Sequence, residues 1–179
     1  MKPKMNPKVL ATGLFNVADD SNMLEKVKDA LFLINEIVIE NGHFRVFVQS
    51  KKIKRQSKSE ILNTVLGDSG HFLVNEIVSY LSGSNAPKNL NKIVFLFNSM
   101  YREKKNIIEV KGVVAKDMDH SQLDSLKTSL DKIFGKQTEL SIEVDPAIIG
   151  GIKLRIENTF LDASIQNQLQ ILRSELLQI

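Results

Sequence analysis

Three histidines, His43, His71 and His120, are the side chains of this 179-residue chain best suited to acid–base chemistry or metal binding. Each lies near a predicted start or end of an element, and no two have the His-x-x-x-His spacing. Metal binding needs convergent ligands, and proton transfer needs a positioned partner. We therefore interpret the histidines as surface or capping residues, and we expect no catalytic residue, no metal site and no cofactor.

A glycine pair, Gly150-Gly151, is the second candidate, because glycine-rich loops can bind phosphate. The pair follows Asp145-Pro146 and leads into a predicted strand, not into a helix. The helix dipole that attracts an anion is therefore missing from this position. We interpret Asp145-Pro146 as the start of a turn, and the glycines as positions that need unusual backbone angles or close contacts.

A short basic run from Lys51 to Lys58 is the best candidate for contact with nucleic acid, through Lys51, Lys52, Lys54 and Arg55. Nucleic-acid binding usually combines a basic face with stacking aromatic residues or a recognised motif. Aromatic residues make up only 6% of this chain, and tryptophan is absent. The favoured interpretation is a solvated link between helices. The alternative is a small nucleic-acid-binding protein that uses this run.

Composition excludes several other classes of protein. The chain has no cysteine, which rules out disulfides, thiolate catalysis and cysteine-based zinc sites. Its longest apolar runs, such as residues 93–97, are far too short to span a bilayer. The positively charged residues 1–8 are not followed by the apolar segment of a secretory signal. We expect a bacterial cytoplasmic protein.

The first hundred residues predict about six helices with short links, which is typical of a helical bundle. Asn6-Pro7 is predicted to start the first helix, and Asp20-Ser21-Asn22 a longer one that Gly42 closes. Residues 44–48 form a short apolar piece. Ser57-Lys58-Ser59-Glu60 matches a capping box that would open a further helix, and Gly67 is predicted to end that helix.

After residue 104 the apolar residues alternate in three segments, which predicts strands over residues 108–114, 140–144 and 152–156. A capping box at residues 119–122 is predicted to open a helix between the first two strands, and Gly135 to close it. A closing helix follows with a near-heptad stripe. The members of this stripe are Ile165, Leu169, Leu172, Leu176 and Ile179. The predicted fold is therefore a six-helix bundle over residues 1–104, followed by a β-α-β-β-α module over residues 105–179.

One sequence motif in the last third of the chain resembles that of a known family. Asp145-Pro146-x-Ile148-Ile149-Gly150-Gly151, then Asp162-x-Ser164-Ile165 and a leucine-rich end, resembles the δ subunits of bacterial F-type ATP synthases. The mitochondrial counterpart is the oligomycin-sensitivity-conferring protein. The resemblance extends over the whole chain in length and order. Its specific motif residues are Asp145, Pro146, Gly150, Gly151, Asp162 and Ser164.

This resemblance implies a non-catalytic subunit of the peripheral stalk, or stator. Such a subunit links the catalytic head to the membrane sector, so that proton-driven rotation is coupled to ATP synthesis. It implies that the N-terminal segment of an α subunit binds to the bundle, between the first and fifth helices of the bundle. The implied contact residues there are Leu10, Gly13, Ile77 and Tyr80.

The resemblance also implies that the C-terminal module binds the C-terminal end of the b subunit. The implied contact residues are Leu169, Leu172 and Leu176. The subunit would be peripheral, on the cytoplasmic side of the bacterial membrane, and would associate with that membrane only through the complex. No nucleic-acid partner is expected.

Overall fold

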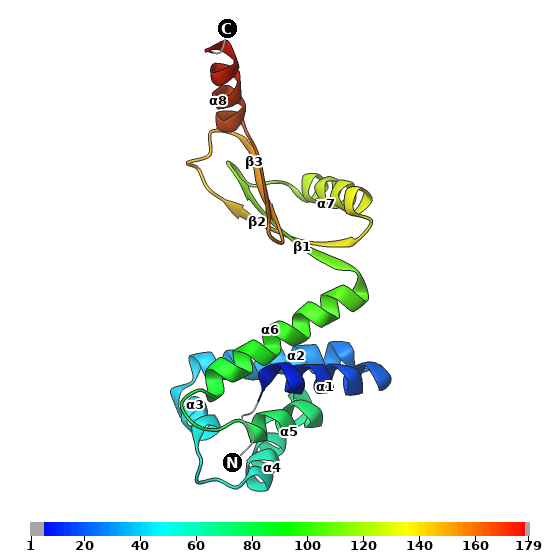
Figure 1. The fold of residues 1–179 in the computed structure, drawn as a ribbon, viewed down its shortest axis with the longest axis vertical. Coiled ribbons are helices and arrows are strands. Elements are labelled where there is room, and N and C mark those ends of the chain that lie inside the picture. Colours follow the sequence, from blue (N-terminus) through cyan, green and yellow to red (C-terminus); the bar gives the residue numbers. More distant parts are fainter. Residues whose placement is uncertain (1–5, 178–179) are drawn as a thin grey trace. The chain divides into compact units, whose positions relative to one another are not determined.

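The computed structural model describes residues 6–177, and within them six α-helices precede the first strand (Figure 1). Ile179, the last predicted residue of the heptad stripe, and the first five residues lie outside this described range. The helices are α1 (Pro7–Asp20), α2 (Leu24–Glu40), α3 (Gly42–Gln49), α4 (Arg55–Leu66), α5 (Phe72–Tyr80) and α6 (Ala86–Lys105). The chain divides into two compact units, residues 1–101 and 102–179.

The core of the helical unit is formed by apolar stripes with helical spacing. On α2 the stripe is Val27, Leu31, Ile34 and Val38, all of which are buried. Phe97 of α6 is buried and meets Phe15 of α1 edge to face, with ring centroids 5.6 Å apart. These stripes hold the helices together, because helices this short gain most of their stability from packing.

The start of α1 agrees with the prediction, but the region around Gly42 does not. The side chain of Asn6 accepts a hydrogen bond from the Lys8 amide at 3.0 Å, and Pro7 is the first helical residue. Gly42, in contrast, begins α3 and does not close the preceding helix. The reason is Asn41, whose side chain caps the amides of His43 and Phe44. Residues 44–48 are consequently helical.

Two other helices begin a few residues away from their predicted starts. The second helix, α2, begins at Leu24. Asn22 has a left-handed φ of 53°, so helical backbone cannot continue from α1 through this residue. The helix predicted to start at residues 57–60 begins earlier, at Arg55. This start places Lys58 on the inner face of α4, where it is buried. Gly67, with φ of 47°, ends α4 as predicted.

The second unit contains a four-stranded sheet in the order β2-β1-β3-β4. Its elements are β1 (Ile107–Val114), α7 (His120–Phe134), β2 (Gln137–Val144), β3 (Gly151–Ile156), β4 (Thr159–Ser164) and α8 (Ile165–Leu176). β1 and β2 are parallel, whereas the other two pairs of neighbours are antiparallel. The predicted mixture of helix and sheet is confirmed.

The predicted order β-α-β-β-α missed the fourth strand. Glu157 has a left-handed φ of 51°, and with Asn158 it reverses the chain so that Ile156 pairs with Thr159. This is a two-residue hairpin without a glycine at either turn position. The motif residues Asp162 and Ser164 therefore lie at the end of a strand that directly precedes α8.

One face of the sheet carries the core of this unit, and α7 packs against that face (Figure 1). The buried residues are Ile108, Val110, Leu130 and Leu154. The helix is opened by the predicted capping box between Asp119 and Gln122, and Gly135 closes it with φ of 62°. The opposite face carries charged side chains in ion pairs, among them Lys153 and Asp162.

Candidate interaction surfaces

The segment that begins with Asp145-Pro146 forms a turn directly after β2. The backbone amide of Asp145 donates to Val114 O at 2.9 Å. Its carboxylate accepts from the Ala147 amide at 2.9 Å, and its carbonyl accepts from the Ile148 amide at 3.1 Å. Ile148 is buried beneath the turn. The aspartate thus closes the turn with side chain and backbone together.

The glycine pair lies where this turn meets the start of α8. Gly151 has φ of 83°, and a Cβ there would overlap Ala163 O and lie 2.8 Å from Ser164 Cα. A Cβ on Gly150 would lie 2.7 Å from Ile165 Cδ1. The Gly150 carbonyl accepts a hydrogen bond from the Ile165 amide at 3.0 Å. Both glycines therefore permit close contact between the turn and the chain that enters α8.

Asp162 and Ser164 build the first turn of α8. The Ser164 hydroxyl accepts from the Asn167 amide at 3.3 Å and caps the helix. Asp162 accepts the Ser164 amide at 2.9 Å, and Asn167 Nδ2 donates to Asp162 O at 2.8 Å. Hydrogen bonds from the side chain and backbone of Ser164 lower the pKa of the Asp162 carboxyl. Sequence reasoning missed Asn167. The signal that could have identified it is an asparagine three residues after the serine that caps the helix.

This scaffold presents a helix whose apolar side is uncovered. No residue of α8 is buried in the described part of the chain. Leu169, Leu172 and Leu176 are 57%, 54% and 66% exposed. A stripe of exposed leucines on a well-capped helix is typical of an interaction surface.

In the helical unit, the predicted contact residues lie on two helices that pack together, α1 and α5. Leu10 and Ile77 are half-buried, whereas Tyr80 is 41% exposed. Gly13 is exposed, and a Cβ there would meet no atom within 4 Å. The face around Gly13 therefore has room for a closely approaching helix.

Arg55 covers Tyr80 on this unit. Its guanidinium lies 3.4 Å from the centroid of the Tyr80 ring and hydrogen-bonds the carboxylate of Glu76. The hydrogen bond and charge of Arg55 lower the pKa of Glu76. Sequence reasoning had assigned Arg55 only to the basic run.

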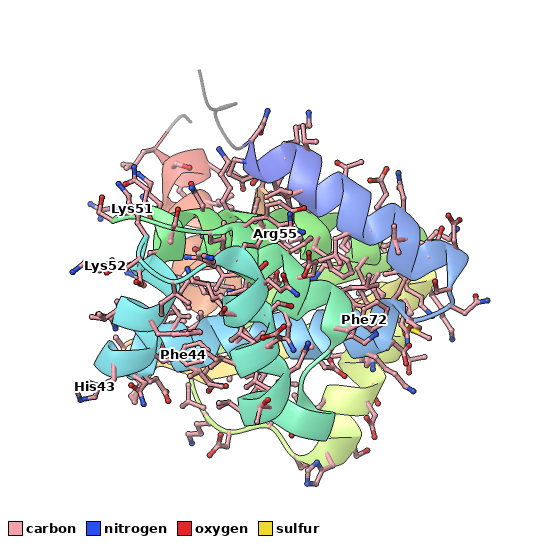
Figure 2. All side chains as sticks on the ribbon, turned by 90° about the horizontal axis from the view of Figure 1, so that it is seen from below. His43, Phe44, Lys51, Lys52, Arg55 and Phe72 are labelled. Carbon is pink, nitrogen blue, oxygen red and sulfur yellow. The ribbon has the colours of Figure 1, made fainter. Side chains whose placement is uncertain are left out.

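The basic run is not a single cationic face. Lys51 and Lys52 are exposed and extend from the periphery of the unit, whereas Arg55 lies over its helices (Figure 2). Lys58, further along α4, is buried. These differences give the nucleic-acid alternative no support.

The three histidines do not converge. His43 lies in the first turn of α3, and His120 is the first residue of α7. His71 caps α5, and its Nδ1 accepts from the Leu73 amide at 3.3 Å. Within residues 6–177 no group of three acidic, histidine or cysteine residues could hold a metal ion. No helix in that range is long and apolar enough to cross a membrane.

Comparison with protein families gives a match over nearly the whole chain. The family described as ATP synthase delta (OSCP) subunit matches residues 8–176. The chain belongs to this family. It is a non-catalytic subunit of the peripheral stalk of ATP synthase.

Delta subunits from several bacteria resemble the chain over most of its length. That of Chloroherpeton thalassium is 28% identical over 166 residues, which cover 93% of this chain and 91% of the relative. That of Rickettsia felis is 28% identical and covers 89% and 87% of the two chains. A sodium-ion-specific delta subunit from Ilyobacter tartaricus is 26% identical and covers 89% and 91%.

A solved structure shares the fold of this delta-family chain. A chain in the cryo-EM structure of the Toxoplasma gondii mitochondrial ATP synthase hexamer matches it with a TM-score of 0.67. The match covers 97% of this chain and 98% of that one, at 23% sequence identity.

Proposed function

We propose that this delta subunit joins two other subunits through separate surfaces. The helical unit, assigned to residues 1–104, binds the N-terminal segment of an α subunit. The unit at residues 105–179 binds the C-terminal end of the b subunit. The observation that carries the proposal is the uncovered leucine stripe of α8.

The b-subunit contact is assigned to Leu169, Leu172 and Leu176. Fully burying one leucine side chain stabilises a complex by about 1.5–3 kcal/mol before the costs of association. Three leucines in one stripe thus supply the apolar centre of this interface. The helix start is fixed by the Gly150 and Ser164 hydrogen bonds, so the stripe is presented in a defined direction.

The α-subunit contact is assigned to Leu10 and Gly13 on α1 and to Ile77 and Tyr80 on α5. An amphipathic helix bound to this face would bury the remaining apolar surface of these residues. Tyr80 is held by Arg55 before binding, so it loses little conformational freedom on complex formation. Tyrosine and arginine are also enriched among the residues that dominate interface energies.

A stator link of this kind needs no reactive group. It must resist torque from the rotor, which requires slow dissociation at both surfaces. Because both surfaces belong to one chain, binding at one raises the effective concentration at the other. The subunit would lie on the cytoplasmic side of the bacterial membrane and reach it only through the complex.

The b-subunit contact can be tested by titrating the full chain with a C-terminal fragment of the b subunit from the same organism. We expect Leu172→Glu to weaken binding by at least tenfold, because a carboxylate would enter the apolar stripe. Gln170→Glu is the matched control, since it places the same group on α8 away from the stripe. Equal affinities for the two variants would refute the assignment of the stripe.

A further inference from the structure

The apolar stripe of α8 has the spacing of a coiled-coil seam with charged residues on both flanks. Ile165, Leu169, Leu172 and Leu176 follow at intervals of four, three and four residues. If Leu169 and Leu176 take the a positions, Ile165 and Leu172 take the d positions. The e positions are then Gln166 and Arg173, and the g positions are Gln168 and Glu175.

The two charged flanking residues are available for a partner. Arg173 and Glu175 are exposed, and neither forms an ion pair with a residue in the range 6–177. Residues at e and g lie beside the seam and set the choice of partner helix in coiled coils. Each flank of α8 therefore carries one charged residue and one neutral glutamine.

A second copy of α8 would not match these charges. In a parallel pair in register, Arg173 would face Gln168 of the other copy. In an antiparallel pair, Arg173 would face Gln166 or another Arg173, and Glu175 would face Gln168 or another Glu175. Neither arrangement brings opposite charges together, so the flanks favour a different chain.

We propose that α8 forms one strand of a two-helix coiled coil whose other strand has an apolar seam, an acidic residue beside Arg173 and a basic residue beside Glu175. The inference rests on the proposed function, in which the C-terminal end of the b subunit supplies this helix. The charge assignment holds whether the partner helix runs parallel or antiparallel to α8. In either orientation each flank of α8 lies beside one flank of the partner.

The apolar surface continues beyond the N-terminal end of the helix. Ile165 packs over Gly150, where a Cβ would lie 2.7 Å from its Cδ1, and the neighbouring Ile149 is exposed. The partner helix therefore has apolar surface to cover past the start of α8.

Charge reversal tests the flanks. We expect Arg173→Glu and Glu175→Lys each to weaken binding of the b-subunit fragment by about threefold to tenfold at low ionic strength. Salt should reduce this difference, since exposed charge pairs are screened. The control is Gln170→Glu, which changes charge on α8 away from the seam, and circular dichroism checks that helix content is retained.

Disulfide trapping tests which residues face each other, and the absence of native cysteine makes it specific. Arg173→Cys and Glu175→Cys are each combined with a series of single-cysteine variants of the b-subunit fragment. We expect the fastest disulfides at a natural aspartate or glutamate for the first variant and at a natural lysine or arginine for the second.

The two levels of the proposal fail differently. If Leu172→Glu abolishes binding but both charge reversals leave it unchanged, the charge inference is wrong and the b-subunit assignment stands. The inference would also be overturned if Arg173→Cys were trapped fastest at an apolar or basic residue of the fragment, or Glu175→Cys at an apolar or acidic one. If Leu172→Glu leaves binding unchanged, the b-subunit assignment itself fails, and the inference fails with it.

Discussion

Lys58, on α4, donates a hydrogen bond from its ammonium group to the carbonyl oxygen of Leu81, the residue after α5, at 3.0 Å. The same ammonium donates to the carbonyls of Val48 at 2.8 Å and Ser50 at 3.0 Å, at the end of α3. The side chain is only 1% exposed, and burial lowers its pKa. One cation thus satisfies the carboxyl-terminal ends of two helices, where the helix dipole favours positive charge.

We predict that Lys58→Met lowers the free energy of unfolding by about 3 kcal/mol, because three buried carbonyls lose their donor. Denaturant unfolding measures the change. Lys52→Met is the control, since Lys52 is an exposed lysine in the loop before α4, and it should change stability by less than about 0.5 kcal/mol. Equal stability of the two variants would contradict the role of Lys58.

Arg102 is predicted to stabilise the sheet by forming ion pairs with two facing carboxylates that would otherwise repel each other. Glu109 on β1 and Glu139 on β2 are paired in register, and Arg102 forms ion pairs with both carboxylates. We expect Arg102→Gln to destabilise the sheet by about 1 kcal/mol, because the facing carboxylates then repel each other. Amide hydrogen exchange of β1 and β2 measures this. Adding Glu139→Gln should restore part of the protection, and a double variant no better protected than the single one would argue against repulsion.

The same cluster predicts a dependence on pH. Burial raises the pKa of Glu109, but the hydrogen bonds and charges of Arg102 and Lys111 outweigh it and hold the pKa below its ordinary value of 4.5. A carboxyl whose pKa is lower in the folded state stabilises the fold above its unfolded pKa. This contribution is lost as the pH falls through the folded pKa. We expect unfolding titrations between pH 6 and about pH 3 to show a smaller acid-induced loss in Glu109→Gln than in the natural protein.

Gly151 is predicted to tolerate no side chain. Gly151→Ala adds a Cβ that overlaps Ala163 O at a backbone φ of 83°, so we expect about 2–3 kcal/mol of destabilisation, concentrated in β3, β4 and α8. Gly13→Ala is the control, because its Cβ meets no atom within 4 Å in α1. That variant should be neutral or stabilised by up to about 1 kcal/mol through helix propensity. A drop in melting temperature for Gly13→Ala that matches Gly151→Ala would contradict this explanation.

Tyr80 is predicted to carry much of the affinity for the α-subunit segment. We expect Tyr80→Ala to weaken binding of a peptide with the α-subunit N-terminal sequence by at least tenfold, because a preordered aromatic anchor is removed. Phe95→Ala is the control, since Phe95 is an exposed aromatic residue on α6. Isothermal titration measures both. Similar losses for the two variants would assign the peptide to a different face of the helical unit.

Signals confined to a few neighbouring residues predicted local structure well. The Asp119–Gln122 capping box, the closing glycines Gly67 and Gly135, and the three alternating strands all have the predicted structure. β4 was missed because its turn uses Glu157 in a left-handed conformation, which sequence patterns rarely assign to glutamate. α3 was missed because the capping role of Asn41 was hidden by the neighbouring Gly42, which resembles a helix end.

The roles of the charged residues depended on contacts between distant segments. Lys58 and Arg55 look like members of one basic run. However, Lys58 is buried and donates hydrogen bonds to three backbone carbonyls, whereas Arg55 stacks on the ring of Tyr80. A pattern of charge along the chain cannot report these contacts, because their partners are 8 to 25 residues away.

By itself, the sequence determined the absence of cysteine chemistry, the helical and alternating segments, and the motif that marks the delta family. These properties depend on residue type and on spacing within one or two turns of chain. The tertiary structure decided which lysine is internal, where the fourth strand pairs, and that the leucine stripe of α8 is left uncovered. Each of these depends on which distant segments pack together, because burial and hydrogen bonding are completed only when those segments meet.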